Sequence, residues 1–183
     1  EPKIVDGSAP LAIADTREGW VDSMALLLNS YLKPDQESIR FDYSLIRPAG
    51  TPIKTFGGVA AGHEPLEKLH KHIVKMFSGR RGEKLTRVDI ADIGNVIGVC
   101  VVSGNVRRSA ELLIGRLDDD NFLNLKNAAA FPERNSYDKD NPGWAWMSNN
   151  SIETSVGVDL SNIVEGISLN GEPGVLWMDM SRK

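Results

Sequence analysis

Cysteine is the scarcest chemically active residue in this chain of 183 residues, which contains only Cys100. A single cysteine cannot form an internal disulfide, and its spacing from His63, His70 and His72 does not resemble a structural zinc site. Long apolar runs are also missing, since no stretch of about twenty apolar residues is present to span a bilayer. We therefore expect no metal site, no membrane segment and a reducing, cytoplasmic setting.

The chain also has fewer basic than acidic residues. The chain has 21 lysines and arginines against 25 aspartates and glutamates, a formal net charge of −4. Proteins that bind nucleic acids or anionic membranes generally need a broad basic surface, so neither partner is expected and any anion site must be local. The 41% of hydrophobic residues and 25% of charged residues are typical of a globular protein. Because the first residue is Glu1 rather than Met, we expect the chain to be cut from a longer one.

Three amphipathic helices are predicted. The first covers residues 15–32, with Asp15 as its N-cap and Glu18 completing an approximate capping box. The second covers residues 64–78 with Pro65 in its first turn. A third begins after Thr86, and its expected buried face consists of Ile90, Ile93, Ile97 and Val101.

Strands are predicted between these helices. Residues 39–45, "IRFDYSL", alternate apolar and polar side chains, and "AELLIG", "WAWMSNNSI" and "GVLWMDM" indicate further strands. A short helix is expected within residues 118–127 and another near residues 161–167. The polar, proline-containing residues 128–144 are expected to form a long surface connection. Helices that alternate with strands predict an α/β fold.

The stretch "CVVSGNVRRSAEL" places two adjacent arginines, Arg107 and Arg108, after a flexible Ser-Gly-Asn sequence. Two permanently charged guanidinium groups in such a loop can donate to a phosphate, a base edge or a carboxylate. The local chemistry alone is equally consistent with two surface charges at a helix-to-strand corner.

A family resemblance favours the functional alternative. "NVIGVCVVSGNVRRSAELLIG" resembles a segment of the adenosylcobalamin-dependent (class II) ribonucleotide reductases, and "IRPAGTPIKTFGG" before it and "MSNNSI" and "NGEPGV" after it occur in the order of that family. The resemblance implies an enzyme of deoxyribonucleotide synthesis for DNA replication, which uses adenosylcobalamin as its cofactor. It also implies that residues 1–183 form part of one catalytic domain, a ten-stranded α/β barrel, with no separate domains.

The same resemblance implies an allosteric site. The start of the helix at Asp15 and Thr16 matches the place where the family meets the sugar and base of a deoxynucleoside triphosphate effector. Arg47 and Lys54, in a first specificity loop over residues 46–63, match positions that hold the phosphates of the effector. For Asp15, a role as a helix N-cap is an alternative that is compatible with effector binding.

A second loop over residues 102–110 is expected to link the effector to the substrate base. It comprises Ser103, Gly104, Asn105, Val106, Arg107, Arg108 and Ser109. In this interpretation Arg107 contacts the base of the ribonucleotide substrate.

No catalytic residue is expected in this chain. Ribonucleotide reduction in the family needs a radical cysteine, two reducing cysteines and an acidic residue, whereas Cys100 is alone and is interpreted as a core residue. Asn149 and Asn150 are interpreted as turn-capping residues. The expected partners are therefore the remainder of the reductase polypeptide, a ribonucleoside di- or triphosphate substrate and the effector. A non-catalytic nucleotide-sensing domain related to the reductase is the alternative.

Overall fold

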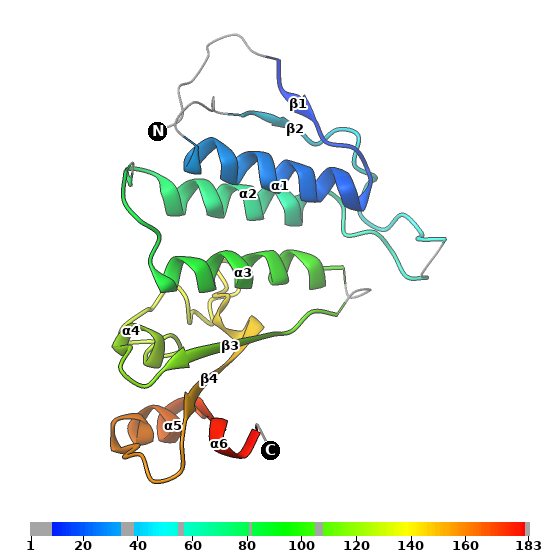
Figure 1. Cartoon of the computed structure of the whole chain (residues 1–183). Coiled ribbons are helices and arrows are strands. Elements are labelled where there is room, and N and C mark those ends of the chain that lie inside the picture. The colour runs from blue at the N-terminus through cyan, green and yellow to red at the C-terminus, as the bar shows by residue number, and fades with distance from the viewer. Residues whose placement is uncertain (1–8, 34–38, 55–56, 81, 105–107, 182–183) are drawn as a thin grey trace. The chain divides into compact units, whose positions relative to one another are not determined.

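The computed structural model describes residues 9–33, 39–54, 57–80, 82–104 and 108–181. The chain divides into two compact units. Unit 1 consists of Glu1–Lys84 and Cys100–Arg108, and unit 2 consists of Leu85–Val99 and Ser109–Lys183. Helices and short strands alternate along the chain, as the α/β prediction requires (Figure 1).

Unit 1 combines a pair of short parallel strands with two long helices. Strand β1 (Leu11–Ala12) pairs with β2 (Phe41–Asp42), and helices α1 (Arg17–Leu32) and α2 (Glu64–Phe77) lie side by side (Figure 1). The strand predicted over residues 39–45 is shorter because the Asp42 carboxylate accepts a hydrogen bond from the Ser44 backbone N–H at 2.9 Å and turns the chain.

Helix α2 confirms the sequence prediction closely. Pro65 occupies its first turn, and its buried face consists of Leu66, Leu69, His70, Ile73 and Phe77. Apolar side chains at three- and four-residue spacing bury one face of a helix, so this pattern was sufficient to locate α2. The Phe77 ring stacks on Tyr31 of α1 with ring centroids 5.3 Å apart.

A buried imidazole connects three segments of unit 1. His70 is 3% exposed; its Nε2 lies 3.2 Å from the Ser23 hydroxyl of α1, and its Nδ1 lies 2.8 Å from the Tyr43 hydroxyl. Burial lowers the pKa of His70 to about 4 and raises the pKa of Tyr43 to about 12. Both groups are therefore neutral at pH 7, which is how a buried polar network avoids the cost of an unpaired charge.

Unit 2 is built on a three-stranded parallel sheet. Its strands are β3 (Glu111–Arg116), β4 (Ser148–Thr154) and β5 (Gly174–Trp177), in the order β3-β4-β5. The residues of helix α3 (Arg87–Val102) up to Val99 belong to this unit. The short helices are α4 (Asp120–Leu123), η1 (Ala145–Met147), η2 (Ser161–Ile163), α5 (Val164–Asn170) and α6 (Met178–Ser181). The core contains Ala91, Phe122, Leu125, Ile152 and Ile163.

The buried face predicted for α3 is wrong. Ile90 is 60% exposed, whereas Ala91 and Val96 are buried together with the polar Asp92 and Asn95. The prediction assumed that only apolar side chains mark the buried face of a helix. Here the polar side chain of Asp92 lies on the buried face of α3 because it binds a buried partner.

That partner is Arg134, from the segment predicted to be a surface connection. Its side chain is 2% exposed and pairs with Asp92, and its Nη1 donates to the Leu125 carbonyl at 2.7 Å. The Trp144 indole N–H also donates to Asp92, at 2.6 Å. Residues 128–144 are rich in turns, as expected, but they contribute a buried cation to unit 2.

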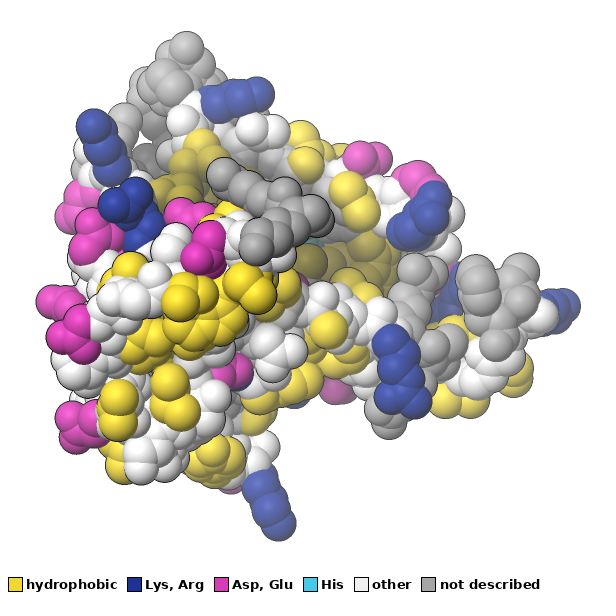
Figure 2. Space-filling model, turned by 60° about the horizontal axis from the view of Figure 1, so that its bottom comes forward, with side chains coloured by type: hydrophobic (Ala, Val, Ile, Leu, Met, Phe, Trp, Pro, Cys, Tyr) yellow, Lys and Arg dark blue, Asp and Glu magenta, His cyan; other side chains and the backbone are white. Residues whose placement is uncertain are grey.

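Hydrophobic side chains are also exposed at the surface (Figure 2). In unit 2 they include Leu112 and Ile114 of β3, which are 63% and 50% exposed, and Leu169 of α5, which is 71% exposed. Among the described residues, no helix combines the length and the apolar character needed to cross a membrane.

The neutral state of His70 predicts a pH-dependent stability of unit 1. A free histidine has a pKa near 6.5, so below that pH the unfolded chain binds a proton that the fold resists until about pH 4. The contribution of His70 to the free energy of unfolding is fully present above about pH 6.5. Up to about 3 kcal/mol of it is lost as the pH falls toward 4. Hydrogen exchange of the α1 and α2 amides in the full-length polypeptide, corrected for intrinsic rates, measures this loss. A His70→Gln variant that retains the same pH dependence would contradict it, and His63→Gln is the matched control.

The buried pair in unit 2 predicts an unequal effect of two arginine substitutions. Arg134→Met leaves the Asp92 carboxylate buried without its cation, and we expect a loss of about 3–5 kcal/mol in the free energy of unfolding. Arg116→Met removes the exposed Arg116–Asp118 pair and should leave the melting temperature close to that of the wild type, because solvent screens a pair at the surface. Thermal denaturation of the full-length polypeptide compares the two variants. Equal melting temperatures would show that the Arg134 pair does not stabilise the fold.

Candidate functional site

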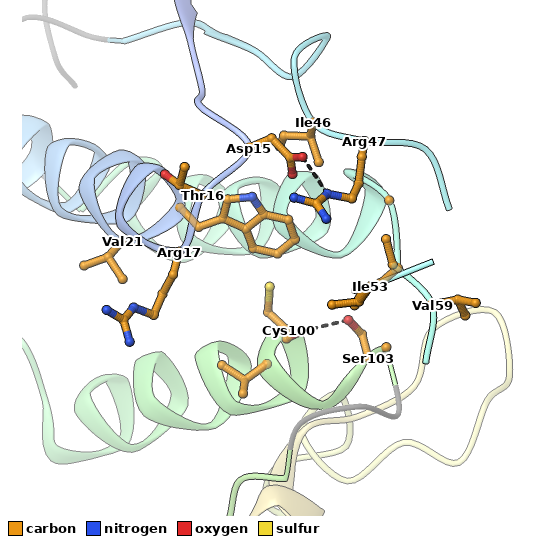
Figure 3. Close-up of a pocket in the computed structure, with 16 residues that line it drawn as sticks. Asp15, Thr16, Arg17, Val21, Ile46, Arg47, Ile53, Val59, Cys100 and Ser103 are labelled. Atoms are coloured by element: carbon orange, nitrogen blue, oxygen red, sulfur yellow. Dashed lines mark hydrogen bonds and ion pairs between the residues drawn. The ribbon is translucent and has the colours of Figure 1, made fainter. Parts of the chain in front are cut away.

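Unit 1 contains a pocket of about 380 Å³. Three segments line it: the start of α1, the loop region over residues 46–62, and the chain at the end of α3 (Figure 3). The lining residues are Asp15, Thr16, Arg17, Trp20, Val21, Ile46, Arg47, Ile53, Val59, Ala60, Ala61, Gly62, Cys100, Val101, Ser103 and Gly104. The ionisable side chains among these lining residues are one aspartate, two arginines and one cysteine.

The start of α1 is fixed by Thr16 rather than by Asp15. The Thr16 hydroxyl accepts a hydrogen bond from the Gly19 backbone N–H at 3.0 Å, so Thr16 is the N-cap. The alternative that assigned the cap to Asp15 is wrong by one residue. A side chain at Gly19 would bring its Cβ to 2.5 Å from the Ala14 carbonyl oxygen, so this corner of the pocket requires glycine.

Asp15 is free of the capping role and binds Arg47 instead. The Arg47 Nε donates to the Asp15 carboxylate at 2.6 Å, and the two side chains are 42% and 31% exposed. The pair ties the start of α1 to the loop region, and the two side chains face each other in Figure 3. Arg17 also lines the pocket, but it extends away from Arg47 in this view and pairs with Glu18 at 2.6 Å.

The loop region folds back on itself. Pro52 and Val59 form an antiparallel bridge, the Gly50 N–H donates to the Ala60 carbonyl at 2.9 Å, and the Ala60 N–H donates to the Thr51 carbonyl at 2.8 Å. Lys54 lies toward the tip of this fold, where it is exposed and is not among the residues that line the pocket.

The end of α3 supplies the third wall. The Ser103 hydroxyl donates to the Cys100 carbonyl at 2.7 Å, and Gly104 lies near Ala61 of the loop region. Cys100 is buried, and burial raises the pKa of its thiol to about 11. The thiol is therefore protonated at pH 7 and is a poor nucleophile. Its interpretation as a core residue agrees with this burial, although it also lines the pocket.

The structure brings together five of the predicted site residues, namely Asp15, Thr16, Arg47, Ser103 and Gly104. Arg108 and Ser109 are described and exposed but do not line the pocket. Asn105, Val106 and Arg107 lie outside the described residues, so the role predicted for Arg107 stays a prediction.

Sequence reasoning missed Trp20 and the apolar walls of the pocket. Trp20 follows Thr16 by one helical turn, and its backbone N–H donates to the Thr16 carbonyl at 3.2 Å. This spacing of four residues puts Trp20 on the same helix face as the predicted site residue, which is the signal that could have identified it.

Asn149 and Asn150 are not turn-capping residues, because both lie within β4. Asn150 is buried, and its side chain accepts a hydrogen bond from the Ser148 hydroxyl at 3.0 Å. Its backbone N–H donates to Glu172 at 3.1 Å, and Glu172 in turn pairs with Lys126 at 2.7 Å. These residues organise the interior of unit 2.

Comparison with known proteins shows which family this chain is similar to. Residues 5–77 match the family model described as "B12-dependent ribonucleotide reductase, insertion domain". The chain is 44% identical over 167 residues to a probable adenosylcobalamin-dependent ribonucleoside-triphosphate reductase of Dictyostelium discoideum. It is 46% identical over 166 residues to an adenosylcobalamin-dependent ribonucleoside-triphosphate reductase of Euglena gracilis. The crystal structure of a B12-dependent (class II) ribonucleotide reductase matches with a TM-score of 0.73 and 34% sequence identity. The chain corresponds to a segment of the class II ribonucleotide reductases.

The matches cover most of this chain but a small part of the larger proteins. The two alignments include 91% of the chain and 21% and 22% of the relatives, and the structural match includes 92% of the chain and 22% of the solved reductase. The chain therefore spans about a fifth of the length of these relatives. The predicted family and the mixed α/β fold with parallel strands are confirmed, while the ten-stranded barrel stays a prediction.

The pocket in unit 1 does not fit the adenosylcobalamin that the family name implies. A pocket of about 380 Å³ is near the small end of the roughly 300–1,000 Å³ typical of small-molecule sites, and a corrin with its nucleotide and adenosyl substituents is much larger than a single nucleotide. Within the described part of the chain, no group of three histidine, cysteine, aspartate or glutamate residues is arranged to hold a metal ion. We therefore do not assign the cofactor to this pocket.

Proposed function

We propose that this chain is part of an adenosylcobalamin-dependent ribonucleotide reductase and that its pocket in unit 1 binds a deoxynucleoside triphosphate effector. The observation that carries this proposal is the composition of the pocket. It joins three residues expected to meet the effector, Asp15, Thr16 and Arg47, with Ser103 and Gly104 at the start of the expected substrate loop. The names of the relatives favour ribonucleoside triphosphates as the substrates.

The chemistry of the pocket suits a nucleotide. The guanidinium group of Arg47 can donate charge-assisted hydrogen bonds to phosphate oxygens while its Nε remains bound to Asp15. The start of α1 adds the partial positive charge of a helix N-terminus beside Thr16. Apolar side chains complete the walls, as is usual for pockets that bury a small molecule. A local site of this kind is compatible with the net negative charge of the chain.

The pocket also suggests how the effector is coupled to substrate choice. Ser103 and Gly104 line the pocket and lead directly into residues 105–109. An effector that contacts this wall favours one conformation of the loop over others by its differential affinity for them. In this proposal Arg107 and Arg108 then contact the substrate base differently for each effector.

The chemical step belongs to the rest of the polypeptide. The buried Cys100 thiol is protonated at pH 7 and is a poor nucleophile for disulfide exchange, and the chain contains no second cysteine to form a redox pair. The exposed Leu112 and Ile114 of β3 are expected to contact other parts of the reductase barrel. Location in the cytoplasm stays a prediction.

Effector binding is tested by the thermal stabilisation of the full-length polypeptide with each deoxynucleoside triphosphate in turn. A ligand that binds only the folded state raises the melting temperature. Arg47→Ala removes a charge-assisted contact, and we expect affinity to fall about tenfold or more. Lys54→Ala tests the second predicted phosphate residue, and Arg116→Ala, which removes an exposed arginine of unit 2, is the control. Unchanged affinity in Arg47→Ala would exclude the pocket as the phosphate site.

The coupling is tested by the choice of substrate. Arg107→Ala in the full-length enzyme should reduce the discrimination among the four ribonucleotides, because the expected contact with the substrate base is lost. The affinity for cobalamin should stay close to that of the wild type. The measurement compares relative rates of reduction with each effector present. Wild-type selectivity in Arg107→Ala would refute the proposed role. A full-length wild-type protein that binds the effectors but reduces no ribonucleotide would favour the alternative of a nucleotide sensor.

A further inference from the structure

The walls of the pocket in unit 1 expose apolar side chains that a folded protein normally covers. Val21 of α1 is 61% exposed, Val59 of the loop region is 49% exposed, and Val101 of α3 is 39% exposed. Each comes from a different segment, and all three line the same pocket. Exposed apolar side chains that gather in a concave site indicate a surface that a ligand covers.

Trp20 is the large aromatic side chain among these residues. It lies one helical turn after Thr16, so its ring belongs to the part of the pocket where the sugar and base of the effector are expected. In the described part of the chain, Trp20 has no aromatic ring partner. Within that part of the chain its indole N–H also donates no hydrogen bond, whereas those of Trp144 and Trp146 donate to Asp92 and Gly143.

The other polar side chains near Trp20 are already engaged. The Thr16 hydroxyl accepts the capping hydrogen bond from Gly19, and the Ser103 hydroxyl donates to the Cys100 carbonyl. Asp15 and Arg47 bind each other. The side chains therefore offer a nucleobase mainly apolar and aromatic contact, with few free hydrogen-bonding groups to read its edges.

We infer that Trp20 is the stacking platform for the base of the bound nucleotide. This inference rests on the proposed function of the same pocket. Stacking on an indole ring tolerates every base, because each base has a π face. One pocket can then accept several deoxynucleoside triphosphates, and discrimination among them falls to the backbone and to the residues that follow Gly104.

The inference is tested with two kinds of ligand on the full-length polypeptide. Trp20→Leu should weaken the binding of dATP by about fivefold to a hundredfold, the range found when a stacking aromatic residue is lost. The binding of inorganic tripolyphosphate, which has no base, should stay within about twofold, and this also shows that the variant is folded. Trp20→Phe keeps an aromatic face and should retain most of the affinity. Trp146→Leu, which replaces an exposed tryptophan of unit 2, is the matched control.

A fluorescence titration gives a second readout. Stacking of a base on Trp20 quenches indole emission, and the quenching by dATP should disappear in Trp20→Phe while binding persists. If Trp20→Leu binds dATP like the wild type while Arg47→Ala does not, the stacking role is wrong and the effector pocket stands. If neither the wild type nor any variant binds a deoxynucleotide, the proposed function and the stacking role fail together.

Discussion

The pocket of unit 1 depends on a single buried imidazole. His70 of α2 binds the Ser23 hydroxyl of α1 and the Tyr43 hydroxyl, and both contacts lead to the pocket. The Ser23 hydroxyl also donates to the Trp20 carbonyl at 2.8 Å, and the Ile46 N–H donates to the Tyr43 carbonyl at 3.0 Å. One side chain that does not line the pocket thus fixes the two segments that carry its aromatic and its cationic residues.

The pocket combines charged groups with apolar surface. Asp15 and Arg47 form an ion pair between two segments, while Val21, Val59 and Val101 present apolar surface from three segments. A nucleotide has the same combination, because its phosphates are anionic and its base is flat and weakly hydrated. The ion pair also keeps Arg47 oriented without a ligand, so less conformational entropy is lost when a phosphate binds.

The sequence was informative where local patterns decide structure, and it failed where distant residues do. Helix α2 followed from periodicity, and the family resemblance identified Asp15 and Arg47, which the fold brings together. The buried face of α3 was missed because Arg134, 42 residues away from Asp92, binds that carboxylate. Likewise, periodicity alone does not separate a tryptophan of the helix core from one that lines a pocket, and only the position of Trp20 one turn after Thr16 distinguishes it.

The closure of the long connection in unit 2 has a practical consequence for labelling the protein. The Arg134 carbonyl accepts hydrogen bonds from the Trp144 and Ala145 N–H groups, both at 3.0 Å, and the Gly143 N–H donates to the Ser136 carbonyl at 2.8 Å. These bonds close the base of the loop over residues 134–145, while Tyr137 within this loop is 99% exposed. A fluorophore or an epitope tag is therefore best attached at Tyr137, where it leaves the hydrogen bonds at the base of this loop intact.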